Sequence, residues 1–268
     1  EIEYVSYNEL MSYVRKLQVT EISQITIQKY LISIKHYYNW CITRNIREDN
    51  PVRNIDIKGV KRRKLHHILK HKELEELYEK YSVTELTEEN KHQSWVKKSA
   101  LTSKRNKVIL GLMIWQGLGT RELTKLEVKD LKLREGTIYI QGSRRSNERE
   151  LKLEAHQVLD LMEYQLKTRV EMLAISKQET EQLFIGVAGG NHFSNIITKL
   201  IQKLREQNSS IENIKQIRAS VITNWLTQYN LREVQYLAGH RYISSTERYV
   251  QDDLENLHEI VNNFHPIN

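Results

Sequence analysis

The chain has 268 residues, with 41 lysines and arginines against 34 aspartates and glutamates, so its formal net charge is +7. Because 39% of the residues are hydrophobic and 28% are charged, the composition indicates a folded globular protein rather than a disordered one. A single cysteine, Cys41, excludes a disulfide scaffold and a cysteine-rich zinc site, and fits a reducing compartment. No apolar run reaches the length of a membrane span and no signal peptide is visible, so we expect a cytoplasmic protein without membrane contacts.

The first 56 residues predict a small helical unit. Apolar residues repeat at helical spacing over Leu10–Leu17 and again from about residue 26 to residue 44. Asn50-Pro51 ends this unit, because the residue before a proline is held in an extended conformation. The predicted division of the chain is a helical domain at 1–60, a basic linker at 61–72 and a second domain at 73–268.

The positive charge is concentrated where these two domains join. Residues 57–72 hold seven basic residues and no acidic one, whereas the segments before and after them are each neutral in sum. Such a local surplus favours contact with an acidic partner such as nucleic acid phosphates, although a solvated basic linker has the same composition. The candidates for these contacts are Lys58, Lys61, Arg62, Arg63 and Lys64.

The rest of the chain predicts a mainly helical domain with a small antiparallel β meander, which is an α+β fold. Helices are expected at 72–80 and 104–116, with a loop or weak helix between them. A glycine-containing break at 117–119 precedes a short helix capped by Thr120. Apolar segments separated by turn sequences predict three strands, at 131–133, 137–141 and 148–153. The elements expected after the meander are a helix at about 155–173, a short strand at 183–186, and helices at 193–205, 213–229, 231–238 and from 244 onward.

Four residues in the last third of the chain form a pattern that suits phosphate chemistry. Lys215 and Arg218 are three residues apart on an expected helix, which places two cations on one face, and an arginine fork binds two phosphate oxygens. His240 follows a glycine at an expected helix end, and Tyr249 lies nine residues later. A phenol, whose ordinary pKa is about 10, becomes a nucleophile where cations and a base lower the cost of its charge. Taken singly, each residue is also typical of a surface charge, a helix-terminal histidine or a packing tyrosine.

This spacing resembles the C-terminal signature of the tyrosine recombinases, also called phage integrases. The family order is a histidine or lysine, an arginine three residues later, about twenty residues, Gly-His, and a tyrosine nine residues beyond. The resemblance covers nearly the whole chain, because the first unit looks like the family's helical core-binding domain and the meander like its three-stranded sheet. It implies a helical domain and a catalytic domain that together clamp double-stranded DNA at a specific recombination site.

The resemblance also implies a mechanism that uses no metal and no other cofactor. Tyr249 is expected to attack a phosphodiester and form a 3′-phosphotyrosyl link, while Arg218 holds the non-bridging oxygens. Lys215 and His240 are expected to share phosphate binding and proton transfer. By the same resemblance we expect a monomer or weak dimer that forms a homotetramer on DNA, with accessory DNA-bending proteins as further candidate partners. The expected role is the integration or excision of a mobile element at the nucleoid of a prokaryotic-type cell.

Two departures from the family pattern concern the basic residues of the site. The family box reads Gly-Leu-Arg-x-x-Glu-Leu, but here Gly119 stands at the arginine position and Arg121 comes two residues later, on another side of a helix. Arg121 as a replacement, Arg121 as a surface residue, and a branch that works without this arginine all stay open. In the hairpin, Arg144 stands where the family has a general-acid lysine; because an arginine stays protonated, Lys215 is the alternative acid. The remaining arginines expected to contact DNA are Arg145, Arg149 and Arg241.

Two rival interpretations share the chemistry or the fold. A type IB topoisomerase uses the same tyrosine chemistry, and the small N-terminal unit favours the recombinase over it. Gly119 and the missing hairpin lysine motivate the second rival, a DNA-binding protein of the same fold that has lost cleavage. The sequence also leaves open whether the apolar stripe after Tyr249 packs on its own domain or on a neighbouring protomer, and whether an arm-binding domain precedes Glu1.

Overall fold

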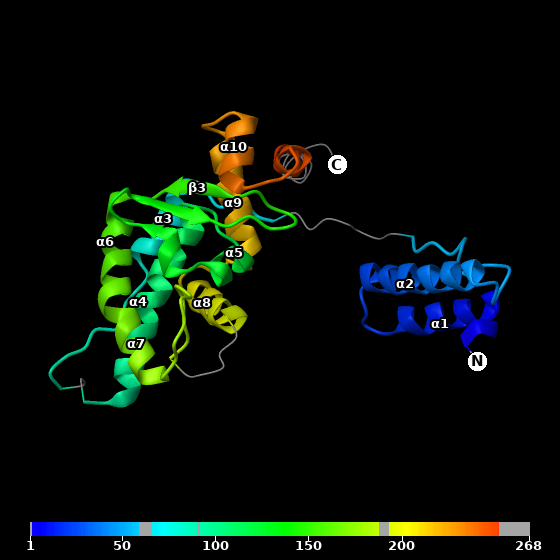
Figure 1. Ribbon diagram of the computed structural model, residues 1–268, viewed down its shortest axis with the longest axis horizontal. Coiled ribbons are helices and arrows are strands. Elements are labelled where there is room, and N and C mark those ends of the chain that lie inside the picture. The colour runs from blue at the N-terminus through cyan, green and yellow to red at the C-terminus, as the bar shows by residue number, and fades with distance from the viewer. Residues whose placement is uncertain (1, 59–65, 90–91, 188–192, 252–268) are drawn as a thin grey trace, which may run out of the picture. The chain divides into compact units, whose positions relative to one another are not determined.

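The computed structural model describes residues 2–58, 66–89, 92–187 and 193–251, which fall into two compact units, Glu1–Lys64 and Leu65–Asn268 (Figure 1). Within the described residues the chain is mostly helical, with one three-stranded antiparallel sheet in the second unit. This is the α+β fold expected from the sequence. None of the described helices has the length and apolar character needed to cross a membrane.

The N-terminal unit is built around a pair of packed helices, α1 (Tyr7–Val19) and α2 (Gln24–Thr43), preceded by a short 3-10 turn, η1 (Ile2–Tyr4). Both helices begin at a serine, because the hydroxyl groups of Ser6 and Ser23 accept from backbone N–H groups of the first turn. The apolar faces of the two helices meet in a small core made of Leu10, Val14, Ile27, Leu31, Tyr38 and Val52.

The central element of the second unit is α4 (Ser94–Ile114), which packs against α3 (His71–Glu79), α6 (Ala155–Glu163), α7 (Arg169–Ser176) and α9 (Ile214–Leu226) (Figure 1). Its last two turns are buried because they are apolar on all sides. The helix starts ten residues earlier than the sequence suggested. Its first turns carry a polar, solvent-facing side that hid their helical period, while their apolar side is buried.

The three strands are β1 (Leu131–Lys132), β2 (Thr137–Ile140) and β3 (Arg149–Lys152), in the order β1-β2-β3. A short 3-10 turn, η2 (Val128–Asp130), leads into β1. The strands pair antiparallel, so that Ile138 lies opposite Leu151. The meander is therefore as expected, with strands a few residues shorter.

The strand expected at 183–186 does not form, and only an isolated bridge between Glu127 and Gln182 lies next to it. Side chains bind the carbonyl groups that a neighbouring strand would otherwise have bound. The hydroxyl of Tyr164 donates to the carbonyl oxygen of Leu183 at 2.9 Å, and Nη1 of Arg105 donates to that of Ile185 at 2.8 Å. Because buried backbone groups need a partner of some kind, these side chains make a strand ladder unnecessary. The helix expected at 155–173 is also interrupted, since α6 passes into α7 through a π-helical segment, η3 (Tyr164–Thr168).

The remaining helices are α5 (Thr120–Lys125), α8 (Phe193–Gln207) and α10 (Leu231–Ala238), and residues 244–251 are also helical. The cap of α5 is Gly119 and not Thr120. Asn213 and Asn230 cap α9 and α10 through their side-chain oxygens, and α10 ends at Gly239 in the left-handed conformation. These local signals place α5, α9, α10 and β3 around one group of polar side chains.

Candidate active site

Arg218 projects from α9 into a group of hydrogen-bond acceptors. Nη1 donates to the carbonyl oxygen of Gly117 and to Oε2 of Glu122, and Nη2 donates to the carbonyl oxygen of Ala238, each at 2.6 Å. The side chain keeps 19% of its surface exposed. The guanidinium group is thus fixed by three acceptors while part of the side chain stays accessible, as a preformed anion site requires.

Glu122, which no expectation from the sequence singled out, is the centre of this group. Oε2 also accepts from the backbone N–H of Gly119 at 2.9 Å, and Oε1 lies 2.8 Å from Nη2 of Arg149. Burial by itself raises the pKa of Glu122, but the charges of Arg218 and Arg149 outweigh it and hold the pKa below its ordinary value. Glu122 is therefore ionised and ties two guanidinium groups together.

Arg149, expected at the DNA surface, is only 2% exposed. It alternates along β3 with the exposed Glu150, which puts it on the same buried face as Leu151. Nε donates to the carbonyl oxygen of Leu237 at 2.8 Å. This burial contradicts the expectation that the Arg149 side chain contacts DNA.

His240 and Tyr249 lie next to each other, with ring planes 6° apart and centroids 5.7 Å apart. Nδ1 of His240 is 2.9 Å from the hydroxyl of Thr246, a residue with no exposed surface. Burial, together with the charges of Arg218 and Arg149, lowers the pKa of His240 to about 4. At neutral pH the imidazole is therefore uncharged, and it can accept a proton beside the phenol.

The β2–β3 hairpin turn packs against the loop that carries His240. Ser146 forms a bridge with His240, and the backbone N–H of Asn147 donates to the carbonyl oxygen of Gly239 at 3.0 Å. Nη1 of Arg241 donates to the carbonyl oxygen of Arg144 at 3.0 Å. The exposed residues that this arrangement places beside the site are Arg144, Arg145 and Arg241.

The other basic residues expected at the site are exposed or lie outside the described residues. Lys215 is exposed in the first turn of α9, one turn before Arg218. Arg121 is exposed on α5 and makes no hydrogen bond or ion pair with another described residue, so the structure does not bring it into the Arg218–Glu122 group. Lys58 is exposed in the N-terminal unit, while the expected contacts Lys61, Arg62, Arg63 and Lys64 lie outside the described residues.

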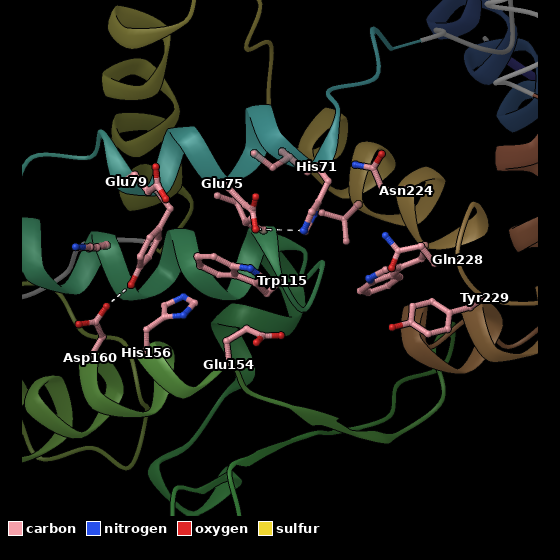
Figure 2. A pocket seen from close by; sticks show the side chains of 16 residues that line it. His71, Glu75, Glu79, Trp115, Glu154, His156, Asp160, Asn224, Gln228 and Tyr229 are labelled. Atoms are coloured by element: carbon pink, nitrogen blue, oxygen red, sulfur yellow. Dashed lines mark hydrogen bonds and ion pairs between the residues drawn. The ribbon is translucent and has the colours of Figure 1, made fainter.

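A cavity of about 770 Å³ opens elsewhere in the same unit, between α3, α4, α6 and α9 (Figure 2). His71 and Glu75, one turn apart on α3, form an ion pair of 3.2 Å on its wall, and the hydroxyl of Tyr78 donates to Asp160. Its acidic side chains repel phosphate, so the cavity does not suit a DNA backbone. The acidic and aromatic residues in its lining include Glu75, Glu79, Glu154, Asp160, Trp115, Trp225 and Tyr229.

Comparison with known proteins now decides the family, because residues 67–256 match the sequence profile described as the phage integrase family. The chain belongs to the phage integrase family. Tyrosine recombinase XerC of Oceanobacillus iheyensis is 23% identical over 268 residues, covering 99% of this chain and 82% of its own. Tyrosine recombinase XerD of the same organism is 26% identical over 265 residues, covering 98% and 83%.

Solved structures agree on the fold of this phage integrase. One similar structure is that of XerH site-specific recombinase bound to palindromic difH substrate, in a post-cleavage complex. The superposition covers 97% of this chain and 72% of the XerH chain, with a TM-score of 0.70 at 20% sequence identity. The Tn1549 transposon integrase, in complex with transposon right end DNA, covers 97% and 87% with a TM-score of 0.64 at 14% identity. The fold class expected from the sequence is confirmed. The family match and the curated relatives confirm the expected enzyme class, a tyrosine recombinase that cuts and rejoins DNA.

Proposed function

We propose that this tyrosine recombinase cuts a specific DNA site through Tyr249. The observation that supports this most directly is the pairing of an uncharged, half-buried His240 with Tyr249, close to the fixed guanidinium group of Arg218. A phenol next to a proton acceptor and a cation has the two aids that nucleophilic attack on a phosphodiester requires.

The reaction exchanges a phosphodiester bond of DNA for a phosphotyrosyl bond. The energy of the broken bond is therefore conserved in the intermediate and is not lost by hydrolysis. Oη of Tyr249 gives its proton to His240 and bonds to phosphorus, while the bond from phosphorus to the 5′ oxygen breaks. Arg218 holds the non-bridging oxygens, where negative charge grows in the transition state. The leaving 5′ oxygen takes a proton, for which we propose Lys215, since Arg144 stays protonated. The 5′ hydroxyl of a second strand then reverses the same steps and releases Tyr249.

The wider assembly belongs to the same proposal. Double-stranded DNA is the partner, and the division into domains at 1–60, 61–72 and 73–268 gives a helical domain, a basic linker and a catalytic domain to contact it. XerH and the Tn1549 integrase, which share the fold, were both solved with DNA. We extend the proposal to a homotetramer on DNA, to accessory DNA-bending proteins, and to the integration or excision of a mobile element at the nucleoid.

A suicide substrate tests this function. A nicked duplex carrying the cognate site loses a short 5′-hydroxyl fragment after cleavage, so a covalent protein–DNA adduct accumulates. We expect the full chain to form this adduct without added metal. Tight binding without an adduct would instead support a DNA-binding protein that has lost cleavage. Relaxation of any supercoiled plasmid, without site preference, would support the topoisomerase.

Replacing four of the six basic residues of the linker should weaken binding to every DNA sequence. The change is Lys61, Arg62, Arg63 and Lys64 to glutamine together, which removes four positive charges from the segment that carries the charge surplus. Each lost phosphate contact lowers the slope of log affinity against log salt by about one unit, so the slope should fall by up to about four. Binding measured by fluorescence anisotropy at several salt concentrations checks this, and an unchanged slope would remove the linker from the DNA interface.

Replacing Thr246 by valine should slow strand cleavage about tenfold to a hundredfold, by analogy with the loss of a group that orients a metal-bound histidine. Valine has nearly the same shape, but it leaves Nδ1 of His240 without the hydroxyl that now lies 2.9 Å away. The ring can then turn away from Tyr249. Serine at the same position keeps the hydroxyl and is the matched control. The rate of adduct formation checks this prediction, which fails if valine and serine give the same rate.

A further inference from the structure

Arg149 is the most deeply buried charge of this cluster, with a side chain that is 0% exposed. Nε donates to the carbonyl oxygen of Leu237, and Nη2 forms an ion pair of 2.8 Å with Oε1 of Glu122. Nη1 has no hydrogen-bond partner among the described residues. Because a buried cation is costly to desolvate, one that is paired only in part needs an explanation beyond packing.

A second buried arginine in the same unit differs from Arg149 in its partners. Arg169 is 8% exposed and donates from Nε and Nη2 to the carbonyl oxygens of Gln182 and Thr180, so it ties down a loop. Arg149 instead shares the carboxylate of Glu122 with Arg218. Two guanidinium groups on one carboxylate leave a net positive charge, and this charge lies behind the accessible side of Arg218. It attracts a phosphodiester and the extra negative charge of its transition state.

Gly239 leaves room for this guanidinium group. Its φ of +68° is a conformation that glycine adopts readily, and a Cβ atom at this position would overlap Nη1 of Arg149. His240 follows directly, and Leu237, two residues before Gly239, accepts the hydrogen bond from Nε. Arg149 therefore contacts the turn that carries His240 as well as Glu122, which holds Arg218.

Position 119 is the place where the chain lacks a cation. Gly119 has a φ of −90°, which any residue adopts. A Cβ atom there would have Oε2 of Glu122 at 3.7 Å and Cδ of Arg218 at 3.9 Å as its nearest neighbours, so a Cβ atom would be in ordinary van der Waals contact. The glycine is thus not required by its backbone conformation or by crowding at Cβ, and position 119 supplies no charge to the site.

We infer that Arg149 is a positioning residue for strand cleavage: its buried guanidinium group fixes Glu122 and the His240 turn, and supplies from behind the positive charge that position 119 does not. The inference rests on the proposed function, because it concerns the same reaction. Arg149 is buried away from the DNA, so it acts through Arg218 and His240.

A pH profile separates this role from a purely structural one. The charged and titratable groups around His240 are Arg149 from β3, Arg218 from α9, Glu122 from α5, and Arg248 and Tyr249 from the following helix. Burial and the charges of the three arginines lower the pKa of His240, and Glu122 raises it. Removing the charge of Arg149 therefore raises this pKa above its present value of about 4. Because the proposed reaction needs uncharged His240, the fall of the cleavage rate at low pH moves to higher pH.

The experiment compares two variants. Arg149→Met removes the positive charge, whereas Arg149→Lys keeps the charge but lacks the planar guanidinium group that binds two partners at once. Cleavage of the suicide substrate should slow about 10²–10³-fold in Arg149→Met, as much as the loss of one oxyanion-hole donor costs, because Glu122 and the His240 turn both lose their support. The loss should be smaller in Arg149→Lys. DNA affinity should stay within about threefold, because the side chain is not at the surface. Arg169→Lys is the matched control and should cleave at the wild-type rate. Adding Gly119→Arg to Arg149→Met should restore part of the rate.

The stability and the cleavage rate of each variant together test the role of Arg149. Melting curves show whether each variant is folded; if Arg149→Met is not, the comparison of Arg149→Lys with Arg169→Lys decides. Folded Arg149 variants with the wild-type rate and the wild-type pH profile would overturn the inference, as would equal losses in Arg149→Lys and Arg169→Lys. A wild-type chain that forms no adduct would instead overturn the proposed function, which keeps the two failures distinct.

Discussion

Alanine at position 218 is expected to slow strand cleavage by about three to five orders of magnitude, the range seen when an arginine that stabilises a phosphoryl-transfer transition state is lost. Affinity for the site DNA should fall by less than about tenfold, because binding is spread over many phosphate contacts. The reason for the difference is geometric. Gly117, Glu122 and Ala238 fix the guanidinium group before substrate arrives, so in the proposed mechanism its charge already lies where negative charge develops.

Single-turnover adduct formation and fluorescence anisotropy measure the two effects of Arg218→Ala separately. Arg134→Ala is a suitable control, because Arg134 is an exposed arginine in the turn between β1 and β2, and both quantities should stay within about twofold of wild type. Equal losses of cleavage and binding in Arg218→Ala would argue against a contact made mainly in the transition state.

Phenylalanine at position 249 should abolish strand cleavage while leaving DNA affinity unchanged. The substitution removes only the hydroxyl, so the ring still packs on Ile222, Val234 and Ala238 and still stacks on His240. Loss of a nucleophile leaves no other route to a covalent adduct. Tyr242→Phe is the control, since Tyr242 is 67% exposed in the loop before the same helix. An adduct formed equally fast by both variants would mean that another residue is the nucleophile.

Local sequence signals predicted much of the C-terminal part of the site. The helices expected at 213–229 and 231–238 are present as α9 and α10 within a few residues. Their ends are set by Asn213, Asn230 and Gly239, whose preferences act over one turn and can be recognised in a sequence. Spacing therefore sufficed to place Lys215 with Arg218 on one helix, and to place His240 at a helix end.

Contacts between distant segments were harder to predict. Glu122 and Arg149 are 27 residues apart and come from a helix and a strand, so neither spacing nor periodicity joins them. From its charge alone, Arg149 was expected at the DNA surface. The alternation of Arg149 with Glu150 and Leu151 was an available signal for the buried face, because side chains of a strand point to opposite faces in turn.

The strand that does not form at 183–186 and the earlier start of α4 have the same physical origin. The segment at 183–186 is apolar and buried, as a strand would be, but Tyr164 and Arg105 bind its carbonyl groups from other parts of the fold. The first turns of α4 are polar on the solvent side, and their helical conformation is supported by the packing of Val96, Ala100 and Leu101. Tertiary contacts of this kind override local patterns.

The most direct test of the central claim is to map the covalent adduct. The wild-type chain is trapped on a suicide substrate, digested with protease and nuclease, and analysed by mass spectrometry for the modified peptide. The proposed function predicts a nucleotide joined through its 3′ phosphate to Tyr249, among the 14 tyrosines of the chain. A link to any other residue, or to a 5′ phosphate, would contradict it.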